Sequence, residues 1–134
     1  EDVPNLKKII NKNNLQNNVE LAGKIDNEEL RLRYSSCDIY LSASTFEVCP
    51  VPTLEAMSCG KPLVLFNINP HKEIIESSSA GVLFSNLSEK EISRQIVKVI
   101  KKKEYYSKNA RIFAEKHDWK TICSQVAKIY EEIS

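Results

Sequence analysis

The sequence lacks a dominant charge and any long apolar run. Its 134 residues include 19 basic and 18 acidic side chains, so the formal net charge is +1. A chain this close to neutral has no single-sign electric field, which gives no support to general nucleic-acid binding. The longest apolar run is far too short to span a bilayer. These absences favour a globular domain that has no nucleic-acid partner.

Metal-ligand and disulfide patterns are also missing. The chain has four cysteines, but no two of them make a C-x-x-C pair, and His71 and His117 do not have the spacing of zinc ligands. Scattered thiols in a chain that shows no secretory signal are typical of a reduced, cytosolic protein. We therefore expect a soluble, cytoplasmic domain without a zinc site.

The chain does have short apolar runs that alternate with helical patterns, which indicates an α/β fold. Strands are expected at 18–23, 38–43, 62–66 and 81–84. The run at 62–66 has no polar alternation, which is typical of a parallel strand buried on both faces. Helices are expected at 3–14, 26–37, 52–59, near 71–78, from 88 to a break near 102–104, at 104–116 and from 118 onward.

Capping residues mark the starts of three of these helices. Asp26 with Glu29, and Ser88 with Glu91, have the spacing of a capping box, in which the first side chain accepts from an amide three residues later. Asp118 is placed to cap the last helix. These signals predict where three helices begin.

A rigid loop and a short helix follow the strand at 38–43. Pro52 fits the first turn of a helix, and Gly60 can supply the left-handed residue that ends it. Val51 has no side-chain oxygen, so the first amide groups of this helix, on Thr53, Leu54 and Glu55, are expected to be free for water or a ligand. A free helix start at the carboxyl end of a strand suits a phosphate or diphosphate.

Two glutamates flank this loop and helix start. Glu47 comes just after the strand at 38–43, where ligands bind in parallel α/β sheets, and Glu55 lies on the helix. The spacing alone is weak evidence, because Glu20 and Glu28 have the same spacing. The strand, the rigid loop and the helix start together make Glu47 and Glu55 candidates for a ligand site.

The segment SASTFEVCPVPTLEAMSCGKPLV, residues 42–64, resembles the glutamate–seven–glutamate motif of the retaining glycosyltransferases with the GT-B fold. The resemblance extends to residues 18–44, 69–85 and 117–130, so it covers nearly the whole chain. It implies a Rossmann-like parallel sheet flanked by helices. Residues 1–134 would then form part of the C-terminal, nucleotide-sugar-binding domain.

The resemblance also implies a strand arrangement. With the order 3-2-1-4-5-6 of such domains, the four expected strands would be numbers 3, 4, 5 and 6. The strand at 18–23 would therefore not be adjacent to the strand at 38–43. The first two strands of that domain, and the family's N-terminal domain, have no counterpart in these residues, so we expect the chain to be a piece of a longer enzyme.

The family implies a role for each residue of the motif. Glu47 would be the catalytic residue that faces the donor sugar close to the reacting carbon, and Glu55 would hydrogen-bond the ribose hydroxyls. Ile25 would lie against the base. Backbone groups of the loop and helix start would contact the sugar and the diphosphate, namely those around Cys49, Pro50, Val51, Pro52 and Thr53.

The predicted reaction is transfer of a sugar from a UDP- or GDP-linked nucleotide sugar to an acceptor, with retention of anomeric configuration. No metal or other cofactor is expected, and the sequence contains no D-x-D pair. The acceptor, a glycan or a lipid, would be bound by the N-terminal domain. A lipid acceptor would make the full-length protein peripheral to the membrane. The isolated chain is expected to be inactive.

Other interpretations stay open. Val48, Cys49 and Pro50 stand where many family members have a glycine-rich sequence, which permits a non-catalytic nucleotide-sugar-binding or partner subunit. A different GT-B enzyme, such as a sugar-nucleotide epimerase, would lack the helix start seen at LEAM, residues 54–57. His71 is expected near a helix start, as a surface or capping residue rather than a base.

Overall fold

The computed structural model describes residues 2–133, which separate into two compact units divided between Leu30 and Arg31. The first unit contains helix α1 (Val3–Lys12) and the first turn of helix α2 (Asn27–Ser36). The Asp26 carboxylate accepts a hydrogen bond from the Glu29 amide at 2.8 Å. The predicted cap at the start of α2 is therefore confirmed.

The predicted strand at 18–23 is wrong. These residues form no strand, and the sheet of the described part of the chain does not include them. A strand satisfies its backbone N–H and C=O groups through neighbouring strands, and its apolar residues alone cannot form a ladder. Alternation of Val19 and Leu21 with polar residues predicted an extended segment, but no strand of the described sheet pairs with it.

The second unit contains a parallel three-stranded sheet, in which β1 (Tyr40–Ser42), β2 (Leu63–Phe66) and β3 (Gly81–Phe84) lie side by side in sequence order. Tyr40 pairs with Leu63, and Leu63 pairs with Gly81. Helix α3 (Val51–Ser58) connects β1 to β2, and helix α4 (Asn69–Ser78) connects β2 to β3. The predicted α/β fold with a parallel sheet is confirmed.

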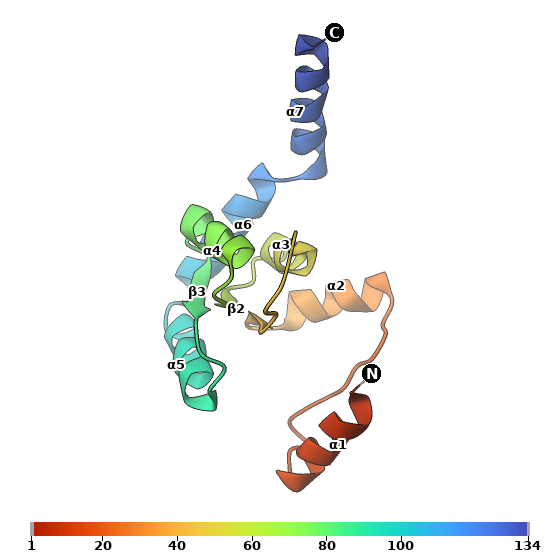
Figure 1. Cartoon of the computed structure of the whole chain (residues 1–134), viewed down its shortest axis with the longest axis vertical. Helices are drawn as coiled ribbons and strands as arrows, with labels where there is room; N and C mark the ends of the chain where they lie inside the picture. Colours follow the sequence, from red (N-terminus) through yellow and green to blue (C-terminus); the bar gives the residue numbers. More distant parts are fainter. Residues whose placement is uncertain (1, 134) are drawn as a thin grey trace. The chain divides into compact units, whose positions relative to one another are not determined.

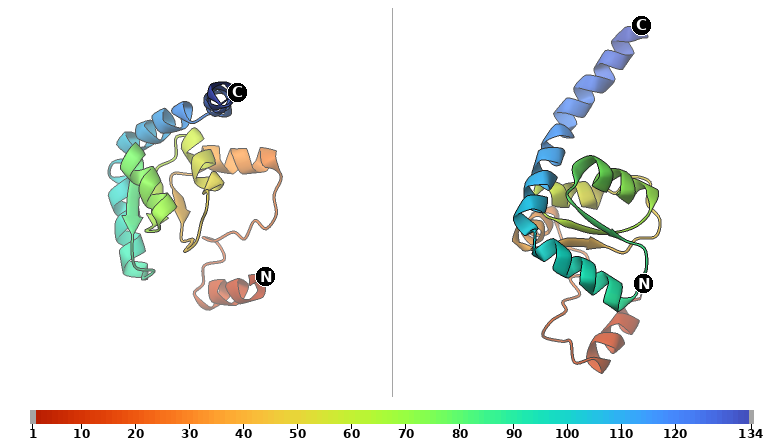
Figure 2. Two further views of the ribbon diagram at one scale, coloured as in Figure 1. Left: turned by 45° about the horizontal axis from the view of Figure 1, so that its top comes forward. Right: turned by 90° about the vertical axis from the view of Figure 1, so that its left-hand side faces the viewer.

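Helices cover both faces of this sheet (Figures 1 and 2). On one face, Leu63 and Leu65 of β2 pack with residues of α3, α4 and α6 (Lys103–Lys116). On the other face, Val64 of β2 packs with β3 and with α5 (Glu89–Ile100). The right-hand view of Figure 2 shows the strands between α4 and α5. Burial on both faces explains why β2 is a continuous apolar run.

The helix caps predicted for α5 and α7 (Trp119–Glu132) are present. The Ser88 hydroxyl accepts from the Glu91 amide at 3.3 Å, and the Asp118 carboxylate accepts from the Thr121 amide at 2.7 Å. The Glu91 carboxylate does not complete the capping box, because the Ser88 amide donates to Asn86 instead. Each helix nevertheless begins where its cap predicts.

Side chains from outside each helix bind the free carbonyl groups at three helix ends. The Asn109 amide donates to Ser79, just after α4, at 3.0 Å, and the Arg111 guanidinium donates to Ser58, the last residue of α3. The Lys61 ammonium donates to Ser35 near the end of α2 at 2.8 Å. These contacts satisfy carbonyl groups that a helix leaves unpaired, and α6 supplies two of the three donors.

Helix α7 differs from the other helices of the second unit that follow the sheet, because none of its residues is buried. Trp119 at its start is 79% exposed. Its apolar side chains nevertheless recur at helical spacing, as the sequence predicts for a helix with one apolar face. No helix among residues 2–133 is long and apolar enough to cross a membrane.

Candidate functional site

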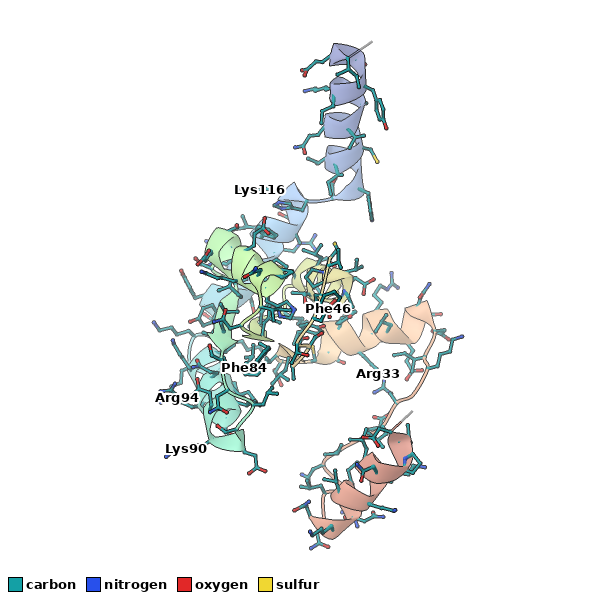
Figure 3. The ribbon with its side chains drawn as sticks, viewed as in Figure 1. Arg33, Phe46, Phe84, Lys90, Arg94 and Lys116 are labelled. Carbon is teal, nitrogen blue, oxygen red and sulfur yellow. The ribbon has the colours of Figure 1, made fainter. Side chains whose placement is uncertain are left out.

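The candidate site lies at the carboxyl edge of the sheet, on the loop between β1 and α3. This loop begins after Ser42 and ends at Pro50, which is buried. Within it, the Ser44 hydroxyl donates to the carbonyl group of Phe46 at 2.9 Å. The Phe46 side chain itself is 78% exposed (Figure 3). The loop therefore has internal support while part of its surface stays open to solvent.

The start of α3 differs from the prediction. The helix begins at Val51, one residue earlier than expected, with Pro50 in the capping position. The amide groups of Thr53 and Leu54 both donate to the Pro50 carbonyl group, at 2.9 and 3.3 Å. Val51 donates to Cys49 at 2.8 Å, and Pro52 has no amide hydrogen. The prediction that these first amides are free for a ligand is therefore wrong, because local carbonyl groups already accept from them.

Glu47 lines a groove at the carboxyl edge. The groove has a volume of about 490 Å³ and lies between the loop after β1 and the start of α4. Glu47 is half-buried there. The residues that line the groove are Thr45, Phe46, Glu47, Ile68, Asn69 and Pro70. A carboxylate in a groove between two strand ends can accept hydrogen bonds from a bound polyol.

The residues directly after Glu47 line a different cavity. Val48, Cys49 and Pro50 contribute to a cavity of about 540 Å³ whose other walls are α3, α4 and α6. Cys49 is exposed. The same short loop thus presents Glu47 to one hollow and Cys49 and Pro50 to another. The predicted contacts of Cys49, Pro50, Val51, Pro52 and Thr53 with a donor stay predictions.

Glu55 is on the second turn of α3 and contacts a tyrosine from α2. The Tyr34 hydroxyl donates to the Glu55 carboxylate at 3.3 Å. Burial, and then the negative charge of Glu55, raise the pKa of Tyr34 from 10.0 to about 12. The tyrosine is therefore a neutral hydrogen-bond donor at any physiological pH, and it holds one oxygen of the Glu55 carboxylate.

The pKa of Tyr40, which is on β1, is influenced by the negative charges of Glu47 and Glu55. Burial raises its pKa first, and the negative charges of Glu47 and Glu55 raise it further, while the nearby Thr53 and Ser42 hydroxyls lower it. The Tyr34 and Tyr40 rings are 6.1 Å apart at an interplanar angle of 55°. Glu47 and Glu55 both belong to the segment that connects β1 to β2.

Sequence reasoning did not identify Tyr34 as a neighbour of Glu55. Tyr34 and Tyr40 were expected only as members of a helix and a strand. No local signal marks the contact, because Tyr34 and Glu55 are 21 positions apart in the sequence. Ile25, the predicted base contact, belongs to the first unit, just before α2, and its role stays a prediction.

His71 is not the surface residue that the sequence predicts. Its side chain is 1% exposed, and Nδ1 lies 2.9 Å from the carbonyl oxygen of Phe66, the last residue of β2. Nε2 has no hydrogen-bond partner in the described part of the chain. His71 lies in the first turn of α4, which begins shortly after β2 ends, so its ring reaches the carbonyl group of the last β2 residue.

Comparisons of this chain with known proteins show the family to which it belongs. The family model described as "Glycosyl transferases group 1" matches residues 1–117. An uncharacterized glycosyltransferase of Methanocaldococcus jannaschii is 31% identical over 99% of this chain and 35% of its own length. An alpha-D-kanosaminyltransferase of Streptomyces kanamyceticus is 25% identical over 97% of this chain and 35% of its own length.

A phosphatidyl-myo-inositol mannosyltransferase of Propionibacterium freudenreichii is 27% identical over 84% of this chain and 30% of its own length. The chain thus spans about a third of the length of these relatives. Sucrose-phosphate synthase from Thermosynechococcus elongatus has a similar structure, with a TM-score of 0.83 and 21% identity over 96% of this chain and 33% of that one. This likeness shows the fold. The family match and these relatives together establish that the chain belongs to the glycosyl transferases group 1 family.

Proposed function

We propose that this chain is the donor-binding part of a retaining glycosyltransferase. The reaction transfers a sugar from a nucleoside-diphosphate sugar, UDP- or GDP-linked, to an acceptor glycan or lipid. Family membership and relatives named as glycosyltransferases support sugar transfer. No metal or other cofactor enters the proposal. Because the names of the relatives differ in the sugar and the acceptor, neither is assigned to this chain.

One observation carries the proposal, namely the groove at the carboxyl edge of the sheet, which Glu47 lines. Ligands bind at this edge in parallel α/β sheets, and a carboxylate there can accept hydrogen bonds from the hydroxyl groups of a sugar. Glu55 lies eight positions further along the chain, on α3, where Tyr34 holds its carboxylate. The two glutamates thus give the connection between β1 and β2 one acceptor for the sugar and one for the ribose.

The two carboxylates have different roles in the proposed reaction. As the nucleoside diphosphate leaves, the anomeric carbon gains positive charge, and a nearby carboxylate at Glu47 stabilises that charge. Glu55 accepts hydrogen bonds from the ribose and thereby positions the diphosphate. Preorganised groups of this kind are each worth about 3–4 kcal/mol of barrier when they face developing charge.

The test is an amide ¹H–¹⁵N correlation spectrum of the chain, titrated separately with UDP, GDP and ADP. We expect shifts around Glu47 and from Thr53 to Glu55, and the nucleotide that causes the largest shifts identifies the base. Shifts at Ile25 would in addition support its contact with the base. A dispersed spectrum that no nucleotide changes at millimolar concentration would contradict the proposal.

A second candidate is a non-catalytic subunit that binds the nucleotide sugar without turnover. The observation that favours it is the paired state of the Thr53 and Leu54 amides, which leaves the start of α3 with few donors for a diphosphate. Release of nucleoside diphosphate from a nucleotide sugar, measured with an enzyme that carries the acceptor-binding domain as well as this chain, separates the two candidates. The transferase predicts release that depends on Glu47, whereas the binding subunit predicts nucleotide binding without release.

A further inference from the structure

Two tyrosines from different elements pack beside each other near α3. Tyr34 is on α2 and Tyr40 is the first residue of β1, and both are half-buried against the apolar cluster between the sheet and α3. The two ring centroids are 6.1 Å apart at an interplanar angle of 55°. A ring packed on these sides has few alternative rotamers, so the Tyr34 hydroxyl can hold a partner at a constant position.

The contact between Tyr34 and Glu55 joins residues that are 21 positions apart. Glu55 is exposed, and the Tyr34 hydroxyl is the partner that holds its Oε2 atom, at 3.3 Å. An exposed glutamate without such a partner samples several rotamers, and ordering its side chain on binding costs free energy. A donor that holds the carboxylate in advance reduces this cost.

We propose that Tyr34 is a positioning residue of the donor site, which orients Glu55 toward the ribose. This inference rests on the proposed function. Tyr34 touches neither the nucleotide nor the sugar and acts only through Glu55. Removal of its hydroxyl group therefore weakens only those ligand contacts that Glu55 makes.

The experiment compares Tyr34→Phe with the unaltered chain in binding of the nucleoside diphosphate that binds best. Loss of one hydrogen bond predicts about three- to tenfold weaker binding for Tyr34→Phe. The same titration with the 2′,3′-dideoxy nucleoside diphosphate predicts no difference between Tyr34→Phe and the unaltered chain, because the ribose hydroxyls are absent.

Tyr105→Phe is the matched control, since it removes the hydroxyl of an exposed tyrosine on α6 and should leave both affinities unchanged. Equal weakening of both nucleotides by Tyr34→Phe would indicate a merely structural role and overturn the inference. Unchanged affinity in Tyr34→Phe, with weaker binding in Glu55→Gln, would overturn it too and leave the proposed function intact. Failure of the unaltered chain to bind any nucleotide would instead overturn the proposed function, and the positioning role with it.

Discussion

Glu47 and Glu55 carry different parts of the proposed reaction, and single substitutions can separate them. We expect Glu47→Gln, made in an enzyme that carries the acceptor-binding domain as well as this chain, to lower the rate of nucleoside-diphosphate release by about 10²–10³-fold while the nucleotide still binds, because the lost charge matters mainly in the transition state. Glu76→Gln, on the exposed side of α4, is the control and should have the unaltered rate. A rate that Glu47→Gln leaves unchanged would remove Glu47 from the catalytic role.

The pKa of Tyr34 reports its contact with Glu55 without any ligand. We expect Glu55→Gln to lower this pKa from about 12 toward the ordinary value of 10.0, because a negative charge beside the phenol is removed while burial persists. A ¹³C-detected titration of the tyrosine ring measures the change. Since the folded pKa is the higher one, the neutral phenol contributes stability below pH 10 that is lost as the pH rises toward 12.

The sequence predicts a site at the two glutamates but does not predict the contact of Tyr34 with Glu55. Glu47 and Glu55 stand next to strong local signals, namely a strand end, two prolines and Gly60. Tyr34 reaches Glu55 across 21 positions, and only the packing of α2 against α3 creates that contact. The buried place of His71 was missed for the same reason, because it depends on how α4 turns over the end of β2.

At the level of helices and strands, local chemistry predicted the starts and ends well. Ser88 and Asp118 cap the helices that the sequence assigns to them, and Gly60 has the left-handed φ of +67° that was expected after α3. The strand at 18–23 was wrong because strand formation requires a partner. The start of α3 was wrong by one residue, because Pro50 takes the capping position by its backbone carbonyl group alone.

A side chain is unfavourable at Gly60 and at Gly81 for different reasons, and alanine substitutions distinguish the two reasons. A Cβ atom on Gly81 would lie 2.0 Å from the carbonyl oxygen of Leu63 on the paired strand, whereas one on Gly60 would lie 3.7 Å from its nearest neighbour. We expect Gly60→Ala to lower the free energy of unfolding by about 1–2 kcal/mol, through backbone strain. Gly81→Ala should lower it by about 3 kcal/mol or more.

Urea denaturation of the two variants measures both changes. Far-ultraviolet circular dichroism before denaturation shows whether Gly81→Ala folds at all. Equal losses in the two variants would contradict the close approach of β3 to β2, because of these two glycines only Gly60 has a left-handed backbone, and Gly81→Ala would then lack the additional clash with Leu63. The comparison therefore tests how closely β2 and β3 approach at Gly81.

The cap of α7 makes its first turn sensitive to pH. The Thr121 amide, which donates to Asp118, holds the pKa of this carboxyl below its ordinary value of 3.8. Because the folded pKa is lowered, the cap stabilises α7 above the ordinary pKa and is lost as the pH falls through the folded one. We expect the Thr121 amide resonance to move toward its unstructured position below about pH 4. In Asp118→Asn, the same resonance should not change over this range.

At the level of the whole chain, α7 carries an exposed apolar stripe. Its members recur at helical spacing and include Trp119, Val126, Ile129 and Ile133, which are 44–79% exposed. Stripes of this kind mark surfaces that other protein covers. We expect the chain to self-associate as its concentration rises, and sedimentation velocity over a range of concentrations measures this association.

Substitutions on the two sides of α7 test the cause of that association. Val126→Lys with Ile129→Lys places charges in the apolar stripe and should shift the chain toward the monomer. Ser124→Lys adds a charge on the opposite side of the helix and should leave the association unchanged. If both changes had the same effect on the association, the association would depend on another surface or on net charge.

Helix α6 makes contacts with parts of the second unit that are far from it in sequence. Its hydrogen bond from Arg111 to Ser58 spans 53 residues, and its ion pair from Lys103 to Asp38, at 2.5 Å, spans 65. Contacts this distant in sequence require the intervening loop to close first, which slows folding relative to a helical bundle of the same length. During synthesis, the ends of α3 and α4 are therefore without their final partners until Asn109 and Arg111 have left the ribosome. A nascent chain that pauses before this point leaves the apolar cluster of the sheet, α3 and α4 without the cover of α6, and such a pause is when a chaperone would be most needed.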